Sequence, residues 1–359
     1  MKKIVLFVIF VLSFFNVYSQ STQTPKTSWK ALEMATRSLD EDDPGSALRY
    51  AEIAKELRKQ EYQTKINILE SAIIPLPVQQ VGDVISDVLY ILEQRNSYDA
   101  VNLINELLNE KGEDFFNNSI TNMQSYLEKL LEYPEADYLI GKVYLYEGEY
   151  AISEEYYKKA LNKSDILDIP DTQFDIRYDL AHLAKIQMND KLYEESLLSI
   201  LEQSNYYSSK SENYGYSKAA LRAATDSKLA EKYFLLYRVN STKFIPAYLK
   251  IADFYKDYNY DDKAFYSITL GVLSAFTRIN DIVSMRNYEY TYSNLDTFFS
   301  YALKYSDIND WMLENDIWQG FLLFADYVSN SGNTTLANEI YDCLKKYCPI
   351  LSIQKLVKY

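Results

Sequence analysis

The sequence predicts an all-α protein, on the basis of two features of its composition and one of its patterning. Only 9 glycines and 8 prolines occur among 359 residues, which is too few for the many turns of a β-sandwich or barrel. Residues that favour helices dominate, and tyrosine is present in 35 copies. Small and apolar residues recur at spacings of three and four, the period of an amphipathic helix. A chain of this length exceeds one compact core, so we expect two domains or one elongated array.

The first residues, MKKIVLFVIFVLSFFNVYSQ, have the pattern of a secretory signal peptide. A basic start at Lys2 and Lys3 precedes an apolar run of about 12 residues, and Ser19 suits the position before a cleavage site. We therefore expect residues 1–19 to be a signal peptide, although retention as an uncleaved anchor stays open. The run is shorter than the roughly 20 residues that cross a membrane. The mature chain is expected to be periplasmic or secreted, with no integral membrane segment.

The stretch YLIGKVYLYEGEYAISEEYYKKAL, residues 138–161, predicts a helix–turn–helix unit. Gly148 marks the turn, and the small residues Gly141 and Ser153 lie where two antiparallel helices would cross closely. Tyr157 falls on the face between the helices and is expected to fill the space there. The residue pattern of this stretch therefore predicts a pair of helices whose backbones approach each other at Gly141.

This stretch resembles a tetratricopeptide repeat (TPR), whose consensus has Leu-Gly, Tyr, Gly-x-Tyr, Ala, an aromatic residue and Ala-Leu at these spacings. Weaker stretches keep the same phase, and they span residues 31–57, 89–108, 180–201, 248–271 and 321–349. The resemblance implies a right-handed α-solenoid of TPR-like helix–turn–helix repeats. Prolines fall near the expected ends of helices, where a residue that cannot continue a helix belongs.

The repeats are divided by one polar segment that breaks their period. SNYYSSKSENYGY, residues 204–216, is expected to be a loop or hinge. It separates N-terminal TPR-like repeats in residues 20–203 from C-terminal TPR-like repeats in residues 217–359. The last nine residues, LSIQKLVKY, are expected to cap the open hydrophobic face at the end of the stack.

The charge and the missing motifs exclude several classes of function. The net charge is −14, and about −16 without Lys2 and Lys3, which disfavours binding to nucleic acid or to anionic lipid. His182 is the single histidine, and the sequence has no HExxH, Gly-rich phosphate loop or G-x-S-x-G pattern. We expect a protein that is not an enzyme and that uses no cofactor and no metal.

Cys343 and Cys348 leave two alternatives open. In an exported protein, a pair of cysteines can form a disulfide. Five positions apart on one continuous helix they would point in different directions, but Pro349 disfavours helical geometry at Cys348, so that the chain could fold back there. The alternatives are a disulfide between Cys343 and Cys348 and two free thiols.

The resemblance also implies a binding surface, because the first helix of each TPR lines the concave side of the solenoid. The family's groove positions fall here on Glu135, Tyr138, Lys142, Leu145, Tyr146, Tyr178, Lys185, Asn189, Leu249, Asp253, Lys256, Asp257, Gln319, Leu322, Asp326 and Asn330. Among these, the candidate partner-binding groove is formed by Tyr138, Lys142, Tyr146, Leu249, Asp253 and Lys256. For Tyr138 and Tyr146, packing between repeats is the alternative to binding. Acids and aromatic residues are mixed with few lysines, so we do not expect the family's clamp for C-terminal carboxylates.

We therefore expect a non-catalytic scaffold or adaptor that binds exported or envelope proteins. Repeats provide an extended surface for binding, and the sequence shows no recognisable set of catalytic residues. One alternative is a structural component of a periplasmic assembly, such as the TPR-containing collar of spirochaetal flagella. Another is a helical-repeat receptor for a peptide, a glycan or a small ligand.

Overall fold

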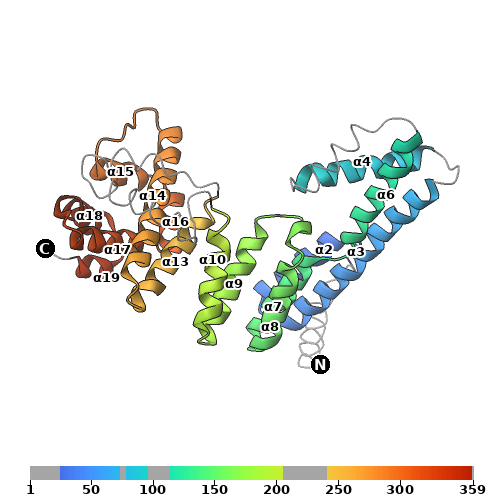
Figure 1. Cartoon of the computed structure of the whole chain (residues 1–359), viewed down its shortest axis with the longest axis horizontal. Helices are drawn as coiled ribbons and strands as arrows, with labels where there is room; N and C mark the ends of the chain where they lie inside the picture. The colour runs from blue at the N-terminus through green and yellow to red at the C-terminus, as the bar shows by residue number, and fades with distance from the viewer. Residues whose placement is uncertain (1–24, 73–77, 96–112, 205–240, 358–359) are drawn as a thin grey trace, which may run out of the picture. The chain divides into compact units, whose positions relative to one another are not determined.

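The computed structural model describes residues 25–72, 78–95, 113–204 and 241–357, and every regular element in these ranges is a helix. The prediction of an all-α protein is thus confirmed for the described residues. Contacts divide the chain into unit 1, Met1–Ile176, and unit 2, Arg177–Tyr359 (Figure 1). The expected signal peptide lies outside the described residues, as does the expected hinge apart from Ser204. Both stay predictions.

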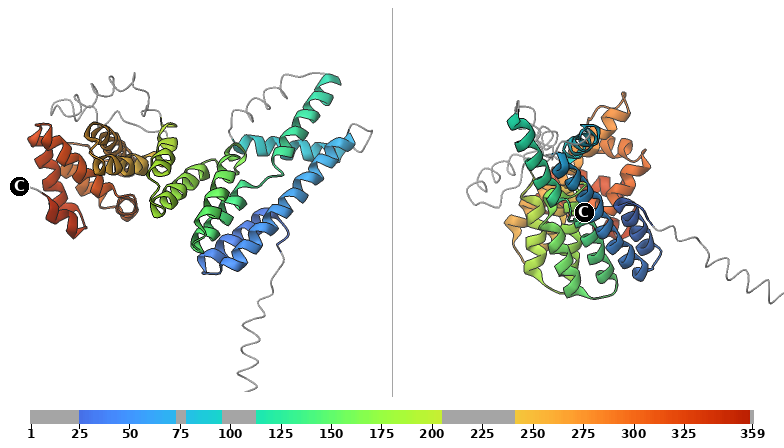
Figure 2. Two further views of the ribbon diagram at one scale, coloured as in Figure 1. Left: turned by 60° about the horizontal axis from the view of Figure 1, so that its bottom comes forward. Right: turned by 90° about the vertical axis from the view of Figure 1, so that its right-hand side faces the viewer.

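Unit 1 is organised around the long helix α3 (Pro44–Ala72). Its other described helices are α2 (Ser28–Asp40), α4 (Val78–Arg95), α6 (Glu113–Lys129), α7 (Pro134–Tyr146), α8 (Tyr150–Leu161) and a 3-10 helix (Ser164–Ile166). Helix α3 packs against α2, α4, α6 and α7, and α8 packs on α7 (Figures 1 and 2). The last residues of unit 1 begin α9 (Thr172–Ile186), which continues into unit 2.

Unit 2 is organised around α14 (Asp261–Arg286), which is buried on every side between Tyr266 and Thr277. Its described helices after α9 are α10 (Asp190–Leu201), α13 (Phe244–Asp257), α14 (Asp261–Arg286), α15 (Leu295–Ala302), α16 (Ser306–Glu314), α17 (Ile317–Asn330), α18 (Thr334–Tyr347) and α19 (Leu351–Leu356). Helix α14 packs against α13, α15 and α17, and α17 packs against α18 (Figure 2). A helix buried all round has no polar face, which explains why small and apolar residues fill this stretch.

Five pairs of consecutive helices in the described ranges are joined by the same turn. Each turn contains one residue with positive φ, at Asp42, Gly148, Met188, Asn259 and Gly332. The N–H of the following residue donates to the carbonyl five positions earlier, as from Glu149 to Tyr144 at 2.8 Å. This is the Schellman ending of a helix, in which the left-handed residue lets the chain reverse. Only two of the five positions carry glycine, so the sequence pattern shows the recurrence incompletely.

The close approach expected at Gly141 is confirmed. The Ser153 hydroxyl donates to the Gly141 carbonyl at 2.8 Å across the α7–α8 pair. A Cβ added to Gly141 would lie 2.6 Å from two ring carbons of Tyr157, which is fully buried. The small residues and the tyrosine therefore act together, because the ring occupies the space that a side chain at position 141 would need.

We expect Gly141→Ala to lower the free energy of unfolding by about 2 kcal/mol, because the buried Tyr157 ring would have to leave its packed position. Urea unfolding followed by circular dichroism measures the change. Gly45→Ala in α3 is the control, because the nearest atom to its added Cβ is 3.7 Å away, and this variant should be neutral or slightly stabilised. Equal effects of the two variants would contradict the close contact.

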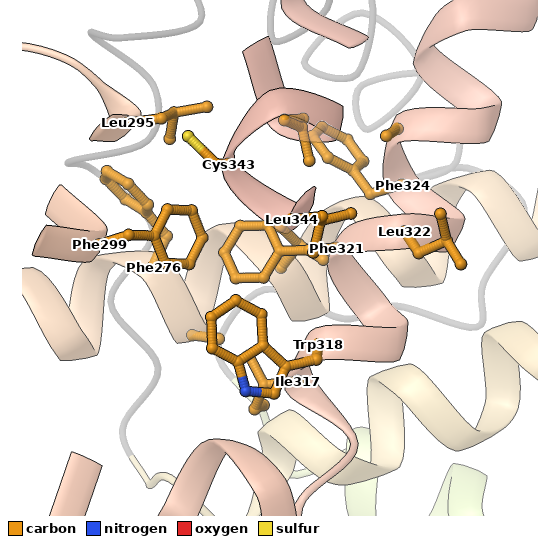
Figure 3. Packing of buried hydrophobic residues seen from close by; sticks show 14 of the residues in the cluster. Phe276, Leu295, Phe299, Ile317, Trp318, Phe321, Leu322, Phe324, Cys343 and Leu344 are labelled. Carbon is orange, nitrogen blue, oxygen red and sulfur yellow. The ribbon is translucent and has the colours of Figure 1, made fainter. Parts of the chain in front are cut away.

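The core of unit 2 is rich in aromatic side chains, which include Phe276 of α14, Phe299 of α15 and Phe321 of α17 (Figure 3). Trp318 is fully buried and its ring stacks on Phe299 at a centroid distance of 5.3 Å. Phe299 also meets Phe321 edge-on and stacks on Tyr347. Phe299 of α15 thus contacts rings of α17 and α18, so Trp318 and Phe299 form the centre of the cluster.

The C-terminal tail, which was expected to cap a hydrophobic face, forms α19. Its Ile353 and the following Val357 are buried in the core cluster of unit 2, and α19 contacts α17 and α18. In the ranges that the structure describes, no helix combines the length and the apolar character needed to cross a membrane. Helix α3 carries charged residues along its length, and α14 carries them in its first turn and from Arg278 onward.

Candidate functional site

Three predicted groove residues, Tyr138, Lys142 and Tyr146, occupy one face of α7 in unit 1, because they are spaced by four. We call this set the α7 face. Tyr146 is 55% exposed, and its hydroxyl donates to an Asp42 carboxylate oxygen at 3.3 Å. The Lys142 Nζ lies 5.6 Å from the centre of the Tyr138 ring. Tyr138 is partly buried, with its ring 5.7 Å from that of Tyr157. The face thus has a packed end at Tyr138 and an open end at Tyr146.

Buried charges hold α7 in place behind this face. Asp137 is almost fully buried and pairs with Lys55 of α3 and Lys159 of α8, each at 3.0 Å. These two ion pairs tie three helices to one carboxylate. Asp137 therefore anchors charges from both neighbouring helices.

A second charged cluster lies at the start of α7. Arg58 is buried and donates to both carboxylate oxygens of Asp168, at 3.0 and 2.8 Å. Its guanidinium lies over the rings of Tyr62 and Tyr133, at 4.5 and 4.6 Å from their centres. The neighbouring Glu135 carboxylate accepts the backbone N–H of Asp168. This arrangement fixes the segment before α9 to α3 and α7, and it is a structural cluster.

Three predicted groove residues, Glu135 of unit 1 and Leu249 and Leu322 of unit 2, are buried, so the groove prediction is wrong for them. Leu249 is buried and packs against Gly271 of α14 and Gly320 of α17, where added Cβ atoms would lie within 3 Å of it. It is a core residue, because the two glycines create the space that its side chain fills. Asp253 and Lys256 of the same helix are exposed. The outward face of α13 therefore begins at Asp253.

Beside Asp253 the structure has a cavity of about 400 Å³ between α10 and α13, which we call the α10–α13 pocket. Its apolar wall comes from Tyr193, Phe254, Tyr258 and Met188. The Phe254 ring lies 5.4 Å from that of Tyr193 and 4.8 Å from that of Tyr258. Met188 is the positive-φ residue of the α9–α10 turn and is 88% exposed, so its side chain stands at the rim.

The polar lining of the α10–α13 pocket is predominantly acidic. It consists of Asp190, Asp253 and Asp257 with one basic residue, Lys185. The Tyr258 hydroxyl donates to Asp190. Burial, followed by the carboxylates of Asp253 and Asp257, raises the pKa of Tyr193 to about 12. The raised pKa reflects both the partly buried phenol and the negative potential inside the pocket.

Sequence reasoning found part of this pocket and missed its aromatic wall. Asp253, Asp257 and Lys185 were expected at groove positions. Phe254 and Tyr258 were not, because neighbours on a helix point in different directions and the pocket needs both the outward and the α10-facing side of α13. Met188 was missed because a methionine at a positive-φ turn gives no sequence signal.

The two cysteines are free and buried, so of the two open alternatives the structure has two thiols. Cys343 belongs to α18 and its sulfur lies beside Leu295 in the core (Figure 3). Cys348 follows α18 in an extended conformation and contacts the Ile350 carbonyl. Burial raises the pKa of the Cys343 thiol to about 12, which makes it a poor nucleophile.

The described residues thus define an all-helical protein that presents an exposed helix face in unit 1 and an aromatic, acidic pocket in unit 2. Within the described ranges, no three His, Cys, Asp or Glu side chains converge in a way that could hold a metal ion. No family model matches the chain. An uncharacterized protein of Treponema pallidum (strain Nichols) is 27% identical over 332 residues, which are 92% of this chain and 88% of the relative. The similarity therefore extends through both units.

Proposed function

We propose that the protein is a non-catalytic scaffold or adaptor that holds a protein partner on the surfaces of its helices. The recurrence of one Schellman turn in five helix pairs supports a TPR-like architecture, and with it a right-handed α-solenoid. Such repeats serve binding because each adds a helix face to a continuous surface. The pattern of residues 1–19 supports export, so the partner is sought among periplasmic or envelope proteins.

The observation that carries the proposal is the exposure of large side chains at equivalent turns. Tyr146 and Tyr150 flank the α7–α8 turn, Met188 forms the α9–α10 turn, and Tyr258 and Tyr260 flank the α13–α14 turn, all of them exposed. Tyrosine and methionine are enriched where proteins bind one another, because they offer apolar area at small conformational cost. Their recurrence at one kind of position favours contact surfaces over chance exposure.

A structural role in a periplasmic assembly is the second candidate. The expected export of the chain and its resemblance to TPR proteins favour it, because the collar around spirochaetal periplasmic flagella contains TPR proteins. In this role the partners would be other components of the same assembly. A receptor for a peptide, glycan or small ligand is the remaining alternative, and the α10–α13 pocket would then be its binding site.

Crosslinking in the native cells, followed by mass spectrometry, tests the proposal. We expect Tyr146→Ala to reduce the yield of a reproducibly captured envelope protein several-fold while the thermal melt of the helices is unchanged, because the ring is largely exposed. Tyr288→Ala is the matched control, since Tyr288 is 99% exposed and belongs to neither surface. Equal capture by both variants would remove the α7 face as a binding surface. Capture of background alone would favour the small-ligand receptor.

A further inference from the structure

The α10–α13 pocket has the geometry of a site for a cation. In its wall the centre of the Phe254 ring lies 5.4 Å from that of Tyr193 and 4.8 Å from that of Tyr258. Ring faces carry negative partial charge and attract ammonium and guanidinium groups that lie over them. The cavity of about 400 Å³ has room for a long side chain. The wall therefore offers apolar contact for the stem of such a side chain and ring faces for its head.

The carboxylates of the pocket are available to a ligand. Asp190 already accepts a hydrogen bond from Tyr258. Asp253 and Asp257 lie one helical turn apart on α13, are exposed, and have no hydrogen-bond or ion-pair partner within the described ranges. Lys185 supplies one positive charge against three negative ones. An anionic ligand would meet repulsion here, and a neutral ligand would leave the two free carboxylates unused.

We infer that the α10–α13 pocket binds the cationic side chain of a lysine or arginine on a protein partner. The inference rests on the proposed scaffold function and assigns one contact within it. The head group lies over Phe254 and Tyr258 and pairs with Asp253 and Asp257, while the stem packs beside Tyr193 and Met188. Arginine suits the site best, because its planar guanidinium both stacks on rings and bonds carboxylates with two N–H groups. The acidic surface of the chain, with a net charge of −14, attracts such a partner at longer range.

Methyl NMR of the mature chain tests this inference without knowledge of the partner. Met188 lines the pocket and is one of 6 methionines in the sequence, so its methyl signal, assigned with Met188→Leu, is a local reporter. The probes are the peptides acetyl-Gly-Arg-Gly-amide and acetyl-Gly-citrulline-Gly-amide, which have nearly the same shape but differ in charge. We expect the arginine peptide to shift the Met188 signal saturably, and the citrulline peptide to bind at least ten-fold more weakly.

Charge variants test whether Asp253 and Asp257 are needed for binding of the arginine peptide. The double variant Asp253→Asn/Asp257→Asn should weaken the arginine peptide at least ten-fold, and Glu339→Gln/Asp342→Asn, two exposed acids on α18, should leave its affinity unchanged. Higher salt should weaken binding as well, since both partners of the pair are partly exposed. Equal binding of the citrulline peptide, or full affinity in the Asp253/Asp257 variant, would overturn the inference. Partner capture by crosslinking is read separately, so a captured partner with no peptide binding would refute the cation site and spare the scaffold function.

Discussion

Replacing Trp318 with alanine is expected to lower the free energy of unfolding by about 4 kcal/mol, the largest single effect we expect in unit 2. The side chain is fully buried and stacks on Phe299, which also contacts Phe321 and Tyr347. Alanine would leave a cavity between α15 and α17 that these rings cannot fill without losing their contacts with one another. Urea unfolding followed by circular dichroism measures the change.

Two further variants show whether the effect of Trp318→Ala comes from the loss of a buried ring. Trp29→Ala makes the same substitution at a side chain that is 61% exposed, and it should cost less than about 0.5 kcal/mol. Trp318→Phe keeps most of the ring and removes a buried N–H that has no hydrogen-bond partner within the described ranges, so it should cost clearly less than Trp318→Ala. A loss below about 1 kcal/mol for Trp318→Ala would mean that the cluster around Phe299 does not hold unit 2 together.

The stability of unit 1 is expected to fall by about 2 to 3 kcal/mol between pH 5 and pH 8 through Glu135. Burial, followed by the charge of Asp168, raises the pKa of Glu135 from 4.5 to about 7. One carboxylate oxygen accepts the Asp168 N–H, and the other is buried with no hydrogen-bond partner among the described residues. The groups that face it are Arg58 on α3, Tyr133 before α7 and Asp168.

The direction of this change in stability follows from the protonation of Glu135 in the folded and the unfolded chain. Between pH 4.5 and about 7 the folded chain holds a proton on Glu135 that the unfolded chain has released, so stability decreases as the pH rises through this window. Glu135→Gln keeps an acceptor for the Asp168 N–H and cannot ionise. This variant should therefore lose most of the pH dependence and be more stable than the natural chain at pH 8. Urea unfolding at several pH values is the measurement.

Glu132→Gln is the matched control for this prediction, because Glu132 is exposed and lies only three positions earlier. It should reproduce the pH dependence of the natural chain. If Glu135→Gln and Glu132→Gln showed the same decline between pH 5 and pH 8, Glu135 would be ionised in the folded protein at all these pH values. Its charge would then be balanced by Arg58 more strongly than its burial implies.

Contacts within one helix pair were predictable from the sequence, and contacts between distant segments were not. Gly141, Ser153 and Tyr157 lie within 16 positions, so the period of the helix alone places them together. Arg58 and Asp168 are 110 positions apart, and nothing in the local pattern of either residue shows that they pair. Leu249 lies at the spacing expected for a groove residue along α13, but it is a core residue because glycines of α14 and α17 leave space for its side chain.

The sequence by itself determined that this protein is helical, because helix period, scarce glycine and proline, and helix-forming residues are local properties that act within a few turns. Only the tertiary structure decided which faces of those helices remain open. Exposure depends on what neighbouring helices cover, and that is set by contacts between residues far apart in the chain. The α10–α13 pocket shows this most clearly, since Tyr193 and Phe254 come from different helices and meet only in the folded unit.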